Sequence, residues 1–296
     1  MQVVSTLLPI ALAIVMLGLG LSLTVADFKR VAVYPRATVI ALVCQVLLLP
    51  AACFGLILLF EPPPVLAVGM MLLAASPGGS TANLFSHLFG GDVALNVTLT
   101  AVNSVLAVVT LPLVVNFALG HFMAADGAVG LQFDKSLQVF AIILIPVAIG
   151  MALRSRFPAF ADRMTRPVRI TSIAVLILAL AAAVLQEIDH LGEYIAQIGV
   201  LTLLFNVLSL AVGYFAPRLA RVGKRESIAS CMEIGIHNGT LAIAIALSPT
   251  LLNDSRMAVP ALTYGLWMFI TAAVAGYLLR RGIRSEADSP AEPAVS

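Results

Sequence analysis

The segment EIGIHNGT, residues 233–240, places a carboxylate, an imidazole and an amide inside a hydrophobic run that extends from residue 227 to residue 247. Glu233 is the one carboxylate that the sequence does not place in a loop or a tail. A charged side chain at the centre of a membrane is costly, so an acidic residue there indicates a functional site by default. The sequence therefore predicts a polar, functional break in the middle of a membrane span.

A second polar segment, SPGGSTAN at residues 76–83, interrupts another hydrophobic run, 65–89. Pro77 has no backbone donor and clashes with the preceding helical turn, and Gly78 and Gly79 add backbone freedom. Unwound backbone is tolerated within a membrane only where it is buried in protein or lines a cavity. We therefore expect the two breaks to face inward, toward each other. The alternative is a pair of structural kinks, since glycine and proline are common in membrane helices.

The composition shows what kind of elements must position these residues. The 296 residues are 60% hydrophobic and 11% charged, with a mean hydropathy of +1.04, whereas soluble domains are about 25% charged. A membrane-spanning helix needs about 20 mostly apolar residues. The expected fold is therefore an all-α polytopic membrane protein with nine transmembrane helices and no sizeable soluble domain. The nine runs are 3–25, 37–60, 65–89, 92–120, 134–153, 168–187, 195–217, 227–248 and 256–279.

The basic residues orient these spans. Of the 17 lysines and arginines, 15 fall on one side of the membrane, leaving Lys135 and Arg256 on the other. Cytoplasmic loops carry the Lys/Arg excess, so we expect the N-terminus outside and the C-terminus inside. The first run could instead be a signal peptide, but no basic residue precedes it. The polar segment 282–296 is expected to be a disordered cytoplasmic tail.

The two interrupted runs occupy corresponding places in the chain. Each is the middle member of a trio, spans two to four and spans seven to nine, and the two trios enter the membrane in opposite directions. Gly- or Pro-interrupted helices at corresponding positions of two halves indicate the binding site of a secondary transporter. The polar residues of the neighbouring spans either join helices or line the cavity. These residues are Asn103, Ser104, Asn206 and Ser209.

At these segments the chain resembles the bile acid:sodium symporter family, including its bacterial members. The resemblance extends from LGLGLSLT (17–24) through SPGGSTANLFSHLFGGDVALNVTLT (76–100) to EIGIHNGTLA (233–242). It implies a transmembrane domain over residues 1–281, built as an inverted repeat with a core and a panel, in which two broken helices cross. The implied core comprises about 37–120 and 195–281, and the implied panel about 1–30 and 134–187.

The resemblance also implies two sodium sites behind the crossing. Two of the first-site positions depart from the family pattern, because Ala82 has lost a hydroxyl and Asn96 carries an amide in place of one. The backbone carbonyl of residue 82 and the amide oxygen of residue 96 could still bind sodium. The implied ligands of the first site are Ala82, Asn83, Asn96, Thr100 and Glu233.

The second implied site has one unusual member, His237, where the family pattern has glutamine. A neutral imidazole nitrogen is a poor sodium ligand, and histidine titrates near physiological pH. The chain therefore binds either one sodium or two, or a proton performs part of the coupling; alternatively, His237 points aside and bonds a carbonyl group. The implied ligands of the second site are Gln45, Glu233, Ile234, Ile236 and His237.

The resemblance places substrate contacts on the broken segments. Exposed half-helix N-termini and hydroxyl groups suit an organic anion, either bile acid-like or a small carboxylate such as pantoate. Membrane lipids are the other expected partner, with no nucleic acid and no obligate protein partner. No catalytic residue and no metal other than sodium is expected. The implied substrate contacts are Ser80, Thr81, Asn238 and Gly239.

The resulting hypothesis is a sodium-coupled symporter of the bacterial inner membrane that works by alternating access. A proton-coupled or uncoupled carrier of organic anions on the same fold is the main alternative. An intramembrane enzyme is disfavoured, because the sequence has no GxGD, GxSG or HExxH segment. A receptor or scaffold is disfavoured because no sizeable extramembrane domain is expected.

Overall fold

The computed structural model describes residues 13–14, 16–18, 20–124, 133–186, 188–248 and 251–287. Within these ranges the regular structure is helical, with one isolated β-bridge. The first predicted span, 3–25, lies largely outside the described residues. The tail expected from residue 282 also lies partly outside them, and the last helix continues as far as Ala287.

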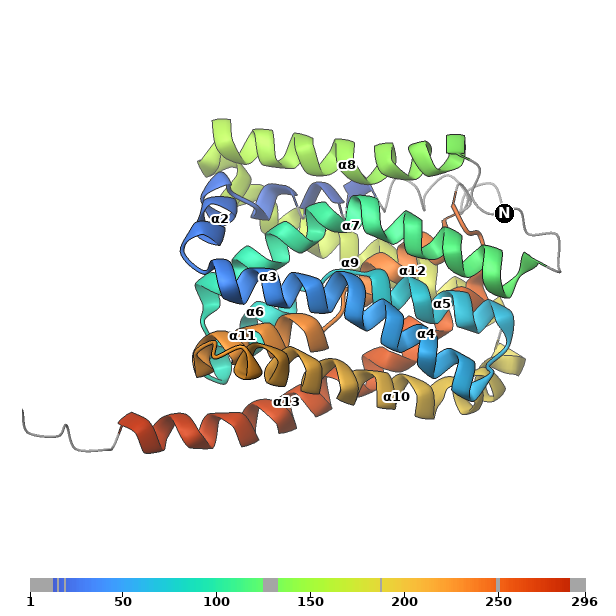
Figure 1. Ribbon diagram of the computed structural model, residues 1–296. Helices are drawn as coiled ribbons and strands as arrows, with labels where there is room; N and C mark the ends of the chain where they lie inside the picture. The colour runs from blue at the N-terminus through green and yellow to red at the C-terminus, as the bar shows by residue number, and fades with distance from the viewer. Residues whose placement is uncertain are drawn as a thin grey trace, which may run out of the picture.

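Helices cover the predicted runs from the second to the ninth (Figure 1), although those over the sixth and seventh runs begin earlier than predicted, at Pro158 and Ile188. The first half contains α2 (Val25–Lys29), η1 (Arg30–Ala32), α3 (Pro35–Val43), η2 (Cys44–Leu48), α4 (Leu49–Phe60), α5 (Pro64–Ala75), α6 (Ser80–Leu88) and α7 (Val93–Phe122). The second half contains α8 (Phe133–Arg156), α9 (Pro158–Gln186), α10 (Ile188–Leu219), α11 (Lys224–Gly235), α12 (Gly239–Leu247), η4 (Ser255–Ala258) and α13 (Val259–Ala287).

Four stretches of the described chain are long and apolar enough to cross a membrane. They coincide with the second, fourth, seventh and ninth predicted spans, and together with the all-helical fold they indicate a polytopic membrane protein. These stretches are Pro35–Phe60, Val93–Phe122, Gly192–Leu219 and Ser255–Arg280.

The third and eighth predicted spans are each divided into two short helices. Helices α5 and α11 have 12 residues each, and α6 and α12 have 9 residues each. At 1.5 Å per residue a 12-residue helix is about 18 Å long, which is too short for an apolar layer of about 30 Å. None of these four short helices is therefore long enough to cross such a layer alone.

Helices α5 and α12 lie inside the molecule among the long helices (Figure 1), whereas α6 exposes Leu84 and Leu88. Every residue from Val65 to Ala75 in α5 and from Leu241 to Leu247 in α12 is buried. Helices that are apolar on all sides are expected in the interior. By contrast, α7 exposes a stripe that includes Val105, Val109 and Leu113, which suits a lipid-facing surface. The unwound segments are thereby kept away from lipid.

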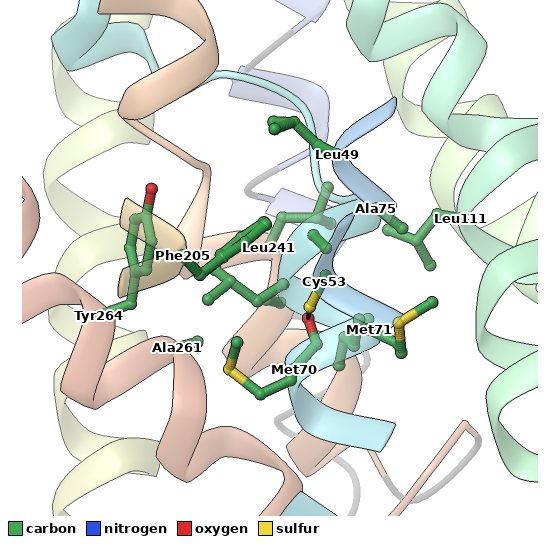
Figure 2. Packing of buried hydrophobic residues seen from close by; sticks show 14 of the residues in the cluster. Leu49, Cys53, Met70, Met71, Ala75, Leu111, Phe205, Leu241, Ala261 and Tyr264 are labelled. Atoms are coloured by element: carbon green, nitrogen blue, oxygen red, sulfur yellow. Dashed lines mark hydrogen bonds between the residues drawn. The ribbon is translucent and has the colours of Figure 1, made fainter. Parts of the chain in front are cut away.

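The interior packing joins both halves of the chain. Figure 2 shows Cys53 of α4 beside Met70 of α5, and Phe205 of α10 beside Tyr264 of α13. The Cys53 thiol donates a hydrogen bond to the Met70 carbonyl at 3.6 Å. Buried side chains of six helices therefore form a continuous support around the crossing. The labelled residues are Leu49, Cys53, Met70, Met71, Ala75, Leu111, Phe205, Leu241, Ala261 and Tyr264.

One irregular turn places a site residue. The backbone from Cys44 to Leu48 is π-helical, and Pro50 follows it inside the same span. Proline has no N–H to bond the carbonyl four residues earlier, Val46, so a local change of helical register is a natural accommodation. The wide turn carries the buried side chain of Gln45, which is 3% exposed.

Candidate ion-binding site

The two unwound segments cross and pair through their backbones. The Gly79 N–H donates to the Ile236 carbonyl at 2.8 Å, and the Asn238 N–H donates to the Pro77 carbonyl at 2.8 Å. Gly78 and His237 thus form the isolated antiparallel bridge. Buried backbone groups that leave a helix need other partners, and each break supplies partners for the other. The breaks therefore face inward and meet, as the sequence predicts.

Glu233 lies directly beside this crossing, two residues before the end of α11. It is 2% exposed, and its Oε2 accepts a hydrogen bond from the Thr100 hydroxyl at 2.6 Å. The carboxylate also lies against Gly78, where a Cβ atom would be 2.2 Å from the Glu233 Cδ atom. The other carboxylate oxygen, Oε1, is buried without a hydrogen-bond donor. One oxygen of a buried acidic group is therefore still to be satisfied.

Helix α7 adds two amide side chains to the site. Asn96 donates through Nδ2 to the Ala229 carbonyl at 2.7 Å. Its Oδ1 atom is buried and has no hydrogen-bond partner. Asn103 lies close enough to Glu233 to act on its carboxylate, although its Nδ2 atom forms no hydrogen bond of normal geometry. Asn96, Thr100 and Asn103 are four and three residues apart, which places them on one face of a helix. This spacing predicts that Asn103 lies on the same face as Asn96 and Thr100. By sequence alone, Asn103 either joins helices or lines the cavity.

Two further residues of the first implied site come from α6. Ala82 is fully buried, and the Oδ1 atom of Asn83 is buried without a donor. The structure places the Thr100 hydroxyl of α7 on Glu233 of α11. Helix α6, which carries Ala82 and Asn83, packs against both of these helices. An unsatisfied buried acceptor costs about 1–3 kcal/mol, and the buried oxygens of Asn83, Asn96 and Glu233 are such acceptors.

Two residues of the second implied site, Gln45 and His237, meet at the Ser76 carbonyl. Gln45 donates to that oxygen through Nε2 at 3.0 Å, and the His237 Nδ1 atom lies 3.2 Å from it. A carbonyl only accepts, so the Nδ1 atom must carry the ring hydrogen, which leaves Nε2 as an acceptor. The Gln45 Oε1 atom and the His237 Nε2 atom are both buried without partners.

The imidazole of His237 is also enclosed by two aromatic rings. Phe205 stacks on it with ring centroids 5.6 Å apart and an interplanar angle of 24°. Tyr264 meets it edge-on with centroids 5.3 Å apart. His237 therefore bonds a carbonyl within a packed pocket, which was one of the alternatives left open by the sequence.

The backbone carbonyls implied at the second site have different surroundings. The Ile236 carbonyl accepts from Gly79, as described above. In a continuous helix the Asn238 N–H would bond the Ile234 carbonyl, but it donates to Pro77 instead. The end of α11 therefore leaves the Ile234 carbonyl without its helical donor, as expected at a helix C-terminus. Such a carbonyl can contribute to cation binding.

The implied substrate contacts lie at the starts of the second half-helices. Asn238 caps α12 by accepting from the Leu241 N–H at 3.0 Å, and Gly239 is the first residue of α12. Thr81 is half-buried in the first turn of α6. Ser80 begins α6, but its side chain lies outside the described part of the chain. Two helix N-termini, which favour anions, thus begin immediately after the crossing.

No basic side chain balances the charge of Glu233 in the part of the chain that the structure describes. The ion pairs in the described residues are Arg30–Asp27, Arg154–Asp162 and Arg256–Asp254, and none of them includes Glu233. The buried polar residues there include neither lysine nor arginine. A buried carboxylate without a partner is strongly disfavoured. The site is thus suited to a small cation bound by oxygen atoms.

The fold and this site define an integral membrane protein in which a buried acidic site lies between two broken helices. This arrangement is that of a transport protein. The chain belongs to the Sodium Bile acid symporter family, whose model matches residues 9–194. That family consists of transporters, not enzymes. The first break lies within the matched residues, and the second lies beyond them.

Several curated proteins are similar over most of the chain. The "Uncharacterized sodium-dependent transporter YocS" of Bacillus subtilis is 26% identical over 264 residues, covering 89% of this chain and 80% of its own length. Because 89% of the chain is aligned, that similarity includes both breaks.

Two eukaryotic relatives are similarly distant. The "Probable sodium/metabolite cotransporter BASS2, chloroplastic" of Oryza sativa is 25% identical over 81% of this chain, which spans 56% of the rice protein. The "Ileal sodium/bile acid cotransporter" of Oryctolagus cuniculus is 25% identical over 82% of this chain and 70% of its own length. Sodium appears in the names of all three proteins, whereas the substrates in those names differ.

Proposed function

We propose that this protein is a sodium-coupled secondary active symporter of an organic anion in a bacterial inner membrane. One observation carries the proposal: buried Glu233 has no basic partner among the described residues, and unsatisfied oxygens of Asn83 and Asn96 accompany it. Sodium would offset the carboxylate charge and satisfy these oxygens at once. Thr100 would contribute its hydroxyl oxygen, and residue 82 its backbone carbonyl.

The proposed architecture has nine transmembrane helices, with the N-terminus outside and the C-terminus inside. Its core and panel follow the divisions given above, and the core is an inverted repeat. The equal lengths of α5 and α11, and of α6 and α12, support the repeat. So does the mutual pairing of the two breaks.

A second sodium is proposed at Gln45, Glu233, Ile234, Ile236 and His237. The unpartnered Gln45 Oε1 atom and the Ile234 carbonyl support it. His237 argues for a weaker site, since its available atom is a ring nitrogen and sodium prefers oxygen. We therefore propose that one sodium ion binds firmly near Glu233 and Thr100, and that a second sodium ion binds more weakly.

Alternating access would couple this ion to the substrate through the crossing. The Thr100 hydroxyl has two acceptors within reach, the Glu233 carboxylate at 2.6 Å and the Asn96 carbonyl at 3.1 Å. Its single hydrogen can move to Asn96 when a cation occupies the carboxylate. Ion binding would then hold α6, α7 and α11 together, and fix the nearby N-termini of α6 and α12.

The proposed substrate is an organic anion, either bile acid-like or a small carboxylate such as pantoate. The N-terminal ends of α6 and α12 favour negative charge. Asn238 uses its Oδ1 atom as a cap, which leaves its amide nitrogen to donate. The sodium/metabolite and sodium/bile acid relatives support this class of substrate.

Uptake into proteoliposomes tests the proposal. An inward sodium gradient should drive accumulation of a labelled substrate chosen by a screen of carboxylates and bile acids. Glu233→Gln should abolish the sodium dependence, whereas Glu226→Gln, near the start of the same helix, should leave it intact. Unchanged sodium-dependent uptake by Glu233→Gln would refute the proposed coupling site.

A proton-coupled or uncoupled carrier is the second candidate, favoured by His237 at a position where the family pattern has an amide. The same vesicles separate these functions. Uptake driven by a pH gradient in sodium-free buffer would establish proton coupling, and uptake that never exceeds equilibrium would establish an uncoupled carrier.

A further inference from the structure

Each broken helix has one backbone carbonyl at its break that accepts from two side chains. After α5, the Ser76 carbonyl interacts with Gln45 and His237, as described above. At the end of α11, the Gly235 carbonyl accepts from the Tyr264 hydroxyl at 2.8 Å and from Asn206 Nδ2 at 3.2 Å. Both lone pairs of the Gly235 carbonyl are therefore in use.

The two amide donors occupy corresponding places in the proposed repeat. Gln45 belongs to the span that precedes the first broken helix, and Asn206 belongs to α10, which precedes the second. Their oxygen atoms differ in one respect. The Gln45 Oε1 atom has no partner, whereas the Asn206 Oδ1 atom accepts a hydrogen bond from the Thr271 hydroxyl. Both polar atoms of the Asn206 amide thus have a protein partner, whereas the oxygen of its counterpart has none.

The groups around Gly235 form a buried, closely packed support. Asn206 and Phe205 are fully buried, and Tyr264 is 1% exposed. The rings of Phe205 and Tyr264 lie 6.0 Å apart, and Figure 2 shows them side by side. Both rings also contact His237. Residues 235–237 are therefore held by α10 and α13 through hydrogen bonds and through aromatic packing.

This support determines which way the neighbouring carbonyls point. The Gly235 carbonyl is bonded toward α10 and α13, and the Ile236 carbonyl accepts from Gly79, the residue before α6. Fixing the peptide plane between Gly235 and Ile236 restricts the rotation of the planes on both sides. The Ile234 carbonyl, which lacks its helical donor, belongs to the peptide plane immediately before this one. Its direction therefore depends on the anchors of Gly235.

We propose that Tyr264 and Asn206 are positioning residues for the cation site. They hold the Gly235 carbonyl away from Glu233 and thereby present the backbone at Ile234 and Ile236 to the ion. This inference rests on the proposed sodium function. It also explains a difference between the two breaks. Thr271 donates to the Asn206 amide oxygen, whereas the corresponding oxygen of Gln45 has no partner.

The test is Tyr264→Phe, which removes only the hydroxyl and keeps the ring beside His237. Tyr277→Phe is the matched control, because Tyr277 lies on the same helix and is 54% exposed. The purified full-length proteins are melted over a sodium chloride series, with choline chloride keeping the ionic strength constant. A ligand that binds the folded state raises the melting temperature by mass action, so the series gives a sodium midpoint for each protein.

Tyr264→Phe should raise the sodium midpoint about fivefold, which corresponds to the loss of one hydrogen bond of about 1 kcal/mol. Tyr277→Phe should keep the wild-type midpoint. In uptake assays at saturating sodium, the substrate KM of Tyr264→Phe should stay within about twofold of wild type. A sodium-specific effect of this kind separates positioning of the ion site from general damage to the fold.

A lower melting temperature in choline with an unchanged sodium midpoint would overturn the inference, because Tyr264 would then be only structural. Absence of sodium stabilisation in the wild type would instead refute the proposed function. Asn206→Leu provides the second variant. It should also raise the sodium midpoint. An unchanged midpoint in both variants would show that neither Tyr264 nor Asn206 positions the ion site.

Discussion

The carboxylate of Glu233 rests on the backbone of Gly78, with no room for a side chain between them. A Cβ atom at Gly78 would lie 2.2 Å from both the Cδ and the Oε1 atoms of Glu233. The acidic residue of the second broken helix is thereby pressed against the unwound segment of the first. Any movement of one break relative to the other must change the surroundings of this carboxylate.

Gly78→Ala should therefore impair sodium-driven uptake by about tenfold or more. The added methyl group overlaps the carboxylate, and overpacking of this kind costs about 1–3 kcal/mol. Since about 1.4 kcal/mol corresponds to a factor of ten, the sodium dependence of uptake should shift measurably. The measurement is initial uptake rate against sodium concentration in proteoliposomes.

Gly79→Ala is the matched comparison, one residue along the same segment. Its Cβ atom would meet nothing closer than the Thr81 Oγ1 atom at 3.4 Å, and its φ of −88° is open to alanine. The loss of uptake should be several times smaller than for Gly78→Ala. Equal losses in the two variants would show that general rigidity of the break matters more than contact with Glu233.

Thr100→Val should raise the sodium concentration for half-maximal uptake by about tenfold. Valine keeps the shape of threonine but leaves Glu233 Oε2 without its donor and removes one oxygen from the site. Hydrogen bonds to charged groups contribute about 1.5–3 kcal/mol. Sodium titrations of uptake measure this shift. Thr100→Ser keeps a hydroxyl and should have a sodium midpoint close to that of wild type.

The control for this variant is Thr98→Val on the same helix. The Thr98 hydroxyl is buried as well, but it donates to the Ala94 carbonyl within α7. Its removal should leave the sodium midpoint within about twofold of wild type. A similar shift in both variants would assign the effect to the packing of α7 and not to the ion.

The breaks themselves were predictable because their cause is local. Pro77 and the adjacent glycines cannot continue a helix, and the structure unwinds at residues 76–79 as expected. In the second segment the structure unwinds at residues 236–238. Asn238 is the residue that caps the next helix. The hydrophobic runs likewise predicted the described spans to within several residues, because burial in a membrane depends on composition over a long window.

The contacts between segments were not predictable from spacing. Thr100 and Glu233 are 133 residues apart, and only the resemblance to a known family placed them together. The sequence did not predict a role for Tyr264. Its hydroxyl donates to the Gly235 carbonyl, and a backbone acceptor is present at every residue, so the sequence does not identify it as a partner. For Asn206 the sequence predicted either a contact between helices or a place in the cavity lining, without choosing between them. The proposed correspondence with Gln45 is the signal that could have assigned it a partner at the second break.

The last prediction concerns His237. Its Nδ1 atom is occupied by the Ser76 carbonyl, and its unpartnered Nε2 atom offers nitrogen where the family pattern offers an amide oxygen. His237→Gln would keep a donor for Ser76 and supply that oxygen. The variant should therefore bind sodium more tightly, with a midpoint lowered about fivefold, and its uptake should depend more steeply on sodium concentration.

Uptake rates measured over a sodium series give both the midpoint and the Hill coefficient. His87→Gln is the control, because His87 is exposed at the end of α6 and should leave both values unchanged. If His237→Gln lowers the uptake rate without changing the sodium dependence, the ring serves only to pack between Phe205 and Tyr264. If the Hill coefficient rises toward two while the midpoint falls, the histidine is the reason that the second ion binds weakly in this protein.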